Sequence, residues 1–104
     1  MDGHARGDVV TIRCAIQNDF QNRFKPRPAV IMEILGDSVL IVPLSCRSGH
    51  AVGTYIDATE QNGLQEQSIA LVLDRQSRPV HDIRQEIGCL EFGVFERLRR
   101  DCGL

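Results

Sequence analysis

The chain has 104 residues, of which 42% are hydrophobic and 25% are charged, a balance typical of a globular rather than a disordered protein. This length suits one hydrophobic core, so residues 1–104 are predicted to form a single domain. The longest apolar run, from Ile34 to Leu44, is broken by polar residues and falls short of the roughly 18 residues of a membrane span. No apolar segment follows the N-terminal charges as in a secretory signal, so we expect a cytoplasmic protein without membrane contact.

The formal net charge of −2 argues against a general nucleic-acid binder, because affinity for the phosphate backbone comes from Lys and Arg. The distribution of charge is more informative than its sum. Arg13, Arg23, Lys25 and Arg27 lie close together in sequence, with only Asp19 among them. A basic loop on an acidic protein suits a small, confined anionic target. From charge alone, a solvated loop is an equal alternative.

The cysteines and histidines are scattered along the chain. The cysteines, at positions 14, 46, 89 and 102, form no C-x-x-C pair, and we expect reduced, mostly buried thiols. His4, His50 and His81 lie far apart in sequence, and each is predicted to be exposed or satisfied by a neighbour rather than to bind a metal. We therefore expect neither a metal site nor a cofactor.

The first half of the chain predicts three strands. Apolar residues alternate with others from Val10 to Ile16, which is the period of a strand with one buried face. A polar loop, 17–26, follows. Ala29–Leu35 and Ser38–Leu44 are nearly continuous apolar runs and should be central strands, joined by a two-residue turn that begins with Gly36.

The second half predicts shorter strands and one helix. Strands are expected at Ala51–Ala58, Ser68–Asp74 and Pro79–Ile83, with a turn at 59–63 between the first two. Leu90–Asp101 has apolar residues along one helical side, and Gly103 would end that helix. The sequence therefore predicts a mainly β (α+β) fold, a small barrel or curled sheet with a C-terminal helix.

Arg27 lies between two prolines at the mouth of the second predicted strand. Each proline fixes its own φ and biases the preceding residue toward extended geometry. Arg27 is thus predicted to be held on stiff backbone. A guanidinium offers a fixed fork of donors that suits phosphate oxygens. From this segment alone, the alternative is an ordinary surface arginine that the prolines hold in place.

Five short motifs then occur in a characteristic order. They are Gly7-Asp8-Val9-Val10, Lys25-Pro26-Arg27-Pro28-Ala29-Val30-Ile31, Val39-Leu40-Ile41-Val42-Pro43-Leu44-Ser45, Asn62-Gly63-Leu64 followed by Ser68, and Ile87-Gly88-Cys89-Leu90. Each alone is weak. Together, from Gly7 to the C-terminal helix, they resemble the MazF/PemK family of toxin endoribonucleases.

The resemblance implies an SH3-like barrel of antiparallel strands with a C-terminal helix, acting as a homodimer. It implies the toxin of a type II toxin–antitoxin system, silenced by a cognate antitoxin protein, which cleaves single-stranded RNA without metal. The family's catalytic arginine corresponds to Arg27. Its catalytic Thr or Ser corresponds to Ser45, for which an ordinary strand-end hydroxyl is the alternative.

Metal-free RNA cleavage is compatible with these two residues. The neighbouring 2′-hydroxyl attacks the phosphorus, and the product ends in a 2′,3′-cyclic phosphate, so the protein supplies charge stabilisation and proton transfer. Arg27 would stabilise the phosphate rather than act as the base, because arginine stays protonated. The base is left open, with His81 beside Asp82 a less favoured candidate.

Further RNA contacts are predicted more loosely. Arg23 and Lys25 are candidates for phosphate binding, and Phe20 or Phe24 for stacking on bases, with anchoring of the loop as the alternative for the aromatics. Asp74 and Arg75 end the fifth predicted strand, where some family members place supporting groups; an ion-paired structural role is the alternative.

A rival function belongs to another class. A catalytically silent SH3-like barrel would bind a protein partner or nucleic acid without cleaving it, because a fold does not fix a function. Cleavage that depends on Arg27 would distinguish the enzyme from the binding module.

Overall fold

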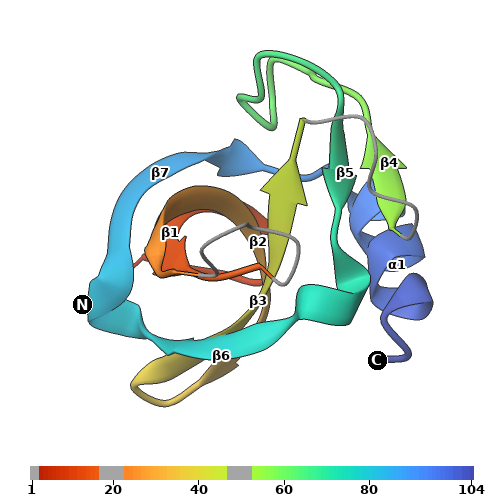
Figure 1. The fold of residues 1–104 in the computed structure, drawn as a ribbon. Helices are drawn as coiled ribbons and strands as arrows, with labels where there is room; N and C mark the ends of the chain where they lie inside the picture. The colour runs from red at the N-terminus through yellow and green to blue at the C-terminus, as the bar shows by residue number, and fades with distance from the viewer. Residues whose placement is uncertain (1–2, 17–22, 47–52) are drawn as a thin grey trace.

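A computed structural model describes residues 3–16, 23–46 and 53–104 of the chain. Antiparallel strands dominate, and one α-helix lies near the C-terminus (Figure 1). The strands are β1 (Asp8–Cys14), β2 (Lys25–Leu35), β3 (Ser38–Ser45), β4 (Thr54–Ile56), β5 (Ser68–Ala70), β6 (Gln76–Pro79) and β7 (Ile83–Cys89). The helices are η1 (Val72–Asp74) and η2 (Val80–Asp82), both short 3₁₀ turns, and α1 (Phe92–Asp101).

The strands curl into a barrel-like ring. β1 pairs with β7 on one side and β2 on the other, β2 pairs with β3, and β3 pairs with β6. The 3₁₀ turn η2 joins β6 to β7 and brings the two ends of the ring together (Figure 1). The mainly β class with a C-terminal helix, predicted from the sequence, is confirmed.

The pairing of β3 with β2 ends at Pro43, while on its opposite edge β3 pairs first with β6 and then with β5. Up to Pro43, which pairs with Ala29, the strand runs beside β2. Beyond that point Leu44 and Ser45 pair with Ala70 and Ile69 of β5. The two strands β2 and β3 therefore separate at their ends, leaving space between them.

Two hydrophobic cores explain why the central strands are apolar on both faces. Inside the ring, one core gathers side chains of β1, β2 and β3: Val10, Ile12, Cys14, Ala29, Ile31, Val39 and Ile41. The second core lies between the sheet and α1 and contains Val9, Val30, Met32, Val42, Leu44, Phe95 and Leu98, among others. Adjacent residues such as Val30 and Ile31 thus face different cores, and the alternating pattern disappears.

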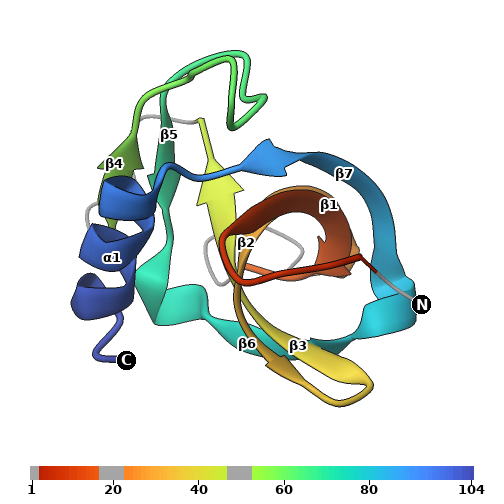
Figure 2. The ribbon, with the colours of Figure 1, turned by 180° about the vertical axis from the view of Figure 1, so that it is seen from behind.

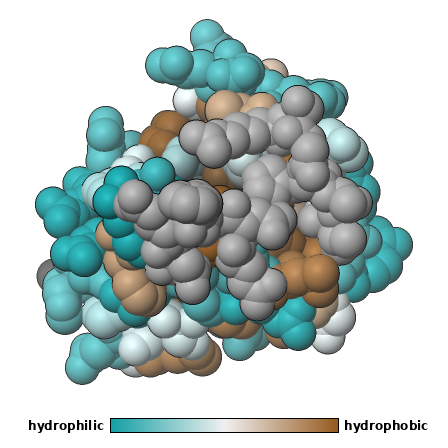
Figure 3. All heavy atoms as spheres, in the orientation of Figure 1, coloured by the Kyte–Doolittle hydropathy of each residue, from teal (hydrophilic) through white to brown (hydrophobic). Residues whose placement is uncertain are grey.

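The helix α1 packs beside β4 and β5 on one side of the molecule (Figures 1 and 2). Phe95 and Leu98 are buried, and Arg97 and Arg100 are exposed, as the helical periodicity predicted. Gly103, with a φ of 76°, follows the last turn and accepts the left-handed geometry of a helix end. In the space-filling view, hydrophilic side chains dominate the rim of one face, with smaller apolar areas between them (Figure 3).

A close approach of two backbone segments fixes the loop between β4 and β5. Gly63 has a φ of 72°, and a Cβ there would collide with the carbonyl oxygen of Ile87. A Cβ on Gly88 would likewise collide with the backbone of Gln61 and Asn62. The buried Asn62 amide accepts the backbone N–H of Leu64 at 3.0 Å, among other bonds. The motifs around Gly63 and Gly88 therefore hold this loop against β7.

Several predicted boundaries are wrong. β1 is Asp8–Cys14 rather than Val10–Ile16, and β2 begins at Lys25, earlier than predicted. The predicted Ser68–Asp74 strand ends at Ala70, where η1 replaces its second half, and within the predicted Pro79–Ile83 strand lies η2. Of Ala51–Ala58, the first two residues lie outside the described ranges, and β4 covers Thr54–Ile56.

β7 was missed altogether. Its sequence, Ile-Arg-Gln-Glu-Ile-Gly-Cys, has three consecutive exposed polar residues and no alternation. Two register shifts against β1 interrupt the pairing, and a bulged strand loses its period of two. Among the residues described, 3–16, 23–46 and 53–104, no helix is of the length and apolarity needed to span a membrane.

Candidate active-site cleft

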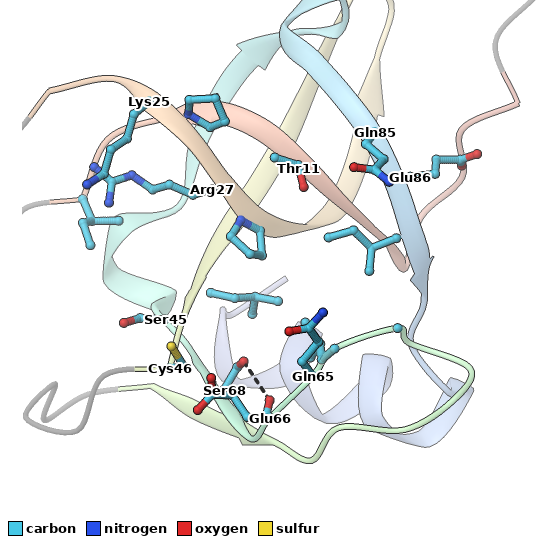
Figure 4. A pocket seen from close by; sticks show the side chains of 17 residues that line it. Thr11, Lys25, Arg27, Ser45, Cys46, Gln65, Glu66, Ser68, Gln85 and Glu86 are labelled. Carbon is cyan, nitrogen blue, oxygen red and sulfur yellow. Dashed lines mark hydrogen bonds between the residues drawn. The ribbon is translucent and has the colours of Figure 1, made fainter.

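A cleft of about 630 Å³ opens where β2 and β3 separate (Figure 4). Its walls come from elements distant in sequence: the start of β2, the end of β3, the 63–68 segment and β7. The lining residues are Thr11, Ile16, Lys25, Pro26, Arg27, Pro28, Leu44, Ser45, Cys46, Gly63, Leu64, Gln65, Glu66, Ser68, Gln85, Glu86 and Ile87. The cleft therefore brings together three of the predicted site residues, Arg27, Ser45 and Lys25.

Arg27 is a buried cation with a fixed orientation. Only 8% of the residue is exposed. Its Nε donates to the Cys14 carbonyl oxygen at 2.9 Å, and its Nη2 donates to the Arg23 carbonyl oxygen at 3.1 Å. Bonds from two different nitrogens fix the plane of the guanidinium, so its position in the cleft wall is preorganised.

The prolines around Arg27 occupy a stretch of β2 that has a neighbouring strand on one side only. Pro26 and Pro28 pair with Arg13 and Thr11 of β1, but β3 has already left the other side of β2 at this point. A proline cannot donate a hydrogen bond to a neighbouring strand, and in sheets it is confined to positions with a free side. The Pro-Arg-Pro segment thus forms a stiff edge of the cleft.

Ser45 lies at the last position of β3, across the opening from Arg27. If the pairing of Ala29 with Pro43 continued for two more residues, Arg27 would face Ser45. The turn of β3 toward β5 instead moves Ser45 to the other side of the cleft entrance (Figure 4). Ser45 is half-buried and Cys46 is exposed. Arg27 and Ser45 therefore line opposite sides of one opening.

The two ends of the cleft differ in chemistry. Lys25 and Arg27 lie next to each other at one end, with Ser45 and Cys46 nearby (Figure 4). We call this the basic end. The far end is formed by Gln65 of the 63–68 segment and Gln85 of β7, which carry amides, whereas Glu66 lies beside Ser68 and the Glu86 side chain points away from the cleft (Figure 4).

The cysteine behind Arg27 is strongly protected. Burial raises the pKa of the Cys14 thiol to about 11, although Arg27 and Arg78 both act to lower it. Cys14 therefore stays a neutral thiol at physiological pH and serves as a core residue. All four cysteines are free thiols; Cys14 and Cys102 are buried, whereas Cys89 is half-buried and Cys46 is exposed, so only two of the four are buried as predicted.

The other predicted site residues lie elsewhere. Arg23 is exposed, and its carbonyl orients Arg27. Asp74 lies in η1, and Arg75 donates to the Val72 carbonyl at 3.3 Å; neither lines the cleft, and their contact with RNA stays a prediction. Phe20 lies outside the described residues.

His81, the less favoured base, is also remote from the cleft. It lies in η2, its side chain is 84% exposed, and its Nε2 is 3.9 Å from Asp82 Oδ1. The sequence did not single out Thr11, Gln65, Glu66 or Gln85, because loop folding and β7 pairing bring them to the cleft. The polar Arg-Gln-Glu run of β7 was the one sequence feature that could have pointed to polar cleft residues in this segment.

The fold is shared with solved bacterial toxin structures. No family model matches the chain, and no curated protein matches its sequence. The structure of an Mtb toxin superposes with a TM-score of 0.66 and 23% identity, over 91% of this chain and 96% of that chain. The Mycobacterium tuberculosis toxin MazF-mt6 superposes with a TM-score of 0.63 and 22% identity, over 89% and 92% of the two chains.

A third structure, an endoribonuclease from a mycobacterial species, superposes with a TM-score of 0.67 and 13% identity, over 99% of this chain and 90% of that chain. Fold and cleft together define a small barrel-like β protein with a preorganised arginine at the separating ends of two strands. Its fold is MazF-like, as the sequence motifs predicted.

Proposed function

We propose that this chain is the toxin of a type II toxin–antitoxin pair and a metal-independent endoribonuclease that cleaves single-stranded RNA. The observation that carries the proposal is the buried Arg27 guanidinium, oriented by the Cys14 and Arg23 carbonyls at the wall of the cleft. The proposal is supported by the ordered motifs around Arg27 and Ser45. It is also supported by the names of the structural neighbours, a MazF toxin and an endoribonuclease.

The reaction would proceed through the RNA's own nucleophile. The 2′-oxygen attacks the adjacent phosphorus, the bond from phosphorus to the 5′-oxygen breaks, and the products carry a 2′,3′-cyclic phosphate and a 5′-hydroxyl. Arg27 would bind the non-bridging phosphate oxygens and stabilise the charge that grows on them. Ser45 would donate one further hydrogen bond from the opposite strand end.

The partners follow from the same proposal. Single-stranded RNA would thread between the basic end and the far end of the cleft, with its phosphate at Lys25 and Arg27. A cognate antitoxin would occupy the basic end, for which an acidic segment is the complementary chemistry. The toxin would act as a homodimer in the cytoplasm.

The test is cleavage of an unstructured RNA by the purified full-length chain in excess EDTA. We expect cleavage without added Mg²⁺. The 2′,3′-cyclic phosphate ends of the products should not ligate to an adapter until the phosphate is hydrolysed and removed. Arg27→Ala protein, prepared in parallel, controls for contaminating ribonuclease. Cleavage that starts only when Mg²⁺ is added would overturn the metal-free mechanism.

One observation favours a second candidate function. Because Arg27 donates to two backbone carbonyls, it could serve the fold and leave the barrel catalytically silent, as a module that binds RNA or a protein. RNA binding with full retention of the substrate would support that module. Cleavage that is lost in a folded Arg27 variant would exclude it.

A further inference from the structure

A histidine and two carboxylates converge beside the start of β1, away from the basic end of the cleft. His4, Asp8 and Glu86 each offer one ligand atom, and these atoms lie within 4.8 Å of one another. His4 Nδ1 is 3.6 Å from Glu86 Oε1. The His4 side chain is 22% exposed and that of Glu86 is 53% exposed, so the cluster is partly sheltered and remains open to solvent on one side.

Local backbone geometry assembles this cluster. The Asp8 carboxylate accepts the Ala5 N–H at 2.8 Å, and the Ala5 carbonyl accepts the Asp8 N–H at 3.1 Å. These reciprocal bonds close a turn that returns His4 toward Asp8. Val9 of β1 pairs with Gly88 of β7, but the next residue, Val10, pairs with Glu86. This register shift changes the direction of the β7 side chains, as bulges do.

Figure 4 shows the result on β7. The Glu86 side chain extends toward the N-terminal segment rather than toward Arg27. The nearby cation Arg6 is engaged elsewhere: its Nε donates to the Met32 carbonyl at 3.3 Å, and its guanidinium lies 5.6 Å from the centre of the Phe95 ring. Arg6 therefore does not fill the space between the two carboxylates.

One ring nitrogen of His4 has no hydrogen-bond partner. This nitrogen, Nδ1, is buried, and its distance of 3.6 Å to Glu86 is too long for a hydrogen bond. If Nδ1 is unprotonated, its negative lone pair faces negative carboxylate oxygens. If Nδ1 is protonated, its N–H reaches no acceptor. A bound cation would satisfy all three groups at once.

The carboxylates are crowded as well. The Asp8 and Glu86 carboxylates each present an oxygen within 4.8 Å of the other. Two carboxylates held together without a cation repel each other.

We propose that His4, Asp8 and Glu86 form a binding site for a divalent transition-metal ion, for which Zn²⁺ is the best-matched probe. One imidazole and two carboxylates suit such ions. Around Zn²⁺, neighbouring N and O ligands are about 3.3–3.5 Å apart, close to the 3.6 Å between His4 and Glu86. Water would complete the coordination on the open side.

The ion would act on structure. It would tie the N-terminal segment to β1 and β7, and Glu86 lies between Gln85 and Ile87, which line the far end of the cleft. Arg27 and Ser45 lie at the other end (Figure 4). The proposal therefore stands or falls independently of metal-free RNA cleavage.

The test uses the full chain without an affinity tag, treated with EDTA, exchanged into chelator-free buffer and titrated with ZnCl₂ by calorimetry. The Cys46→Ser background removes an exposed thiol that could bind the ion. We expect one Zn²⁺ per chain, a higher Tm with Zn²⁺, and retention of the ion against millimolar Mg²⁺. His4→Ala should weaken binding about tenfold or more and abolish the Tm shift.

His81→Ala is the matched control, because its exposed imidazole lies in η2, outside the cluster; it should leave binding unchanged. Circular dichroism in EDTA checks that each variant folds. If His4→Ala does not fold, Glu86→Gln decides, since it keeps the side-chain shape and removes the charge. Equal Zn²⁺ affinity in parent and variant, or no binding by the folded parent, would overturn the site.

Discussion

The two ends of the cleft are built from different kinds of structure. The basic end lies on strands: Arg27 on the stiff Pro-Arg-Pro edge of β2 and Ser45 at the last position of β3. The far end combines the 63–68 segment with β7, which carries register shifts. Strand backbone holds a group in place, whereas loops and bulges set shape and hydrogen bonding. Under the proposed function, the phosphate would lie at the basic end, and the amides of the far end would be free to contact bases.

The largest effect is expected from Arg27→Ala. Removing one preorganised charge stabiliser should lower the rate of RNA cleavage about 10²–10³-fold. Single-turnover cleavage at saturating enzyme measures the chemical step. Arg27→Lys keeps the charge and loses the fork, so it should recover only part of the rate. Activity of folded Arg27→Ala within a few-fold of the parent would remove Arg27 from catalysis.

Gly63→Ala probes the shape of the far end. The positive φ and the collision with the Ile87 carbonyl should lower the free energy of unfolding by about 3 kcal/mol. Gly93 on α1 is the matched control, because a Cβ there meets nothing within 4 Å. Gly93→Ala should be neutral or stabilise by up to about 1 kcal/mol. Urea denaturation measures both; equal stability of the two variants would contradict the packing of the loop on β7.

Ser45→Ala removes one hydroxyl from the basic end. Losing one hydrogen bond to the reacting phosphate, about 1–1.5 kcal/mol, should slow cleavage roughly tenfold. The exposed Ser77 of β6 provides the control, and Ser77→Ala should cleave at the parent rate. If Ser45→Ala changes KM without changing kcat, the hydroxyl binds substrate and transition state equally well.

Lys25→Gln tests the electrostatics of the basic end. Each phosphate contact to single-stranded RNA contributes about −0.7 to the slope of log affinity against log salt concentration. The variant should reduce that slope by about this amount and weaken binding a few-fold at low salt. Arg84→Gln, exposed on β7 and outside the cleft lining, should leave the slope unchanged. An equal change in both variants would mean that overall charge, and not the basic end, attracts RNA.

The smallest effect concerns the alkylation of two thiols, Cys14 in the core behind Arg27 and Cys46 in the cleft lining. At pH 8 iodoacetamide should modify the exposed Cys46 well before Cys14, whose burial and pKa of about 11 leave roughly one thiolate in a thousand. Peptide mass spectrometry follows both sites. Because Cys46 lines the basic end, its alkylation should slow cleavage a few-fold, and Cys46→Ser should resist this effect. Faster modification of Cys14 would contradict the closed core.

The local patterns predicted much of this molecule. The apolar runs of β2 and β3, the glycine turn between them and the amphipathic face of α1 are consequences of short-range periodicity. The Pro-Arg-Pro segment predicted a fixed arginine, because proline restricts the backbone wherever it occurs. β7 could not be predicted in this way, since its polar residues are exposed and its pairing with β1 is irregular.

The sequence by itself determined that Arg27 would stand on stiff backbone at a strand mouth and that the motifs around it resemble those of MazF-type toxins. Only the tertiary structure decided what Arg27 faces. The pairing of β2 with β3 ends at Ala29 and Pro43 while β3 continues beside β5, which opens the cleft, and the close approach permitted by Gly63 and Gly88 sets its far wall. The same folding brings His4 beside Glu86. These contacts join residues distant along the chain, so periodicity within one segment carries no record of them.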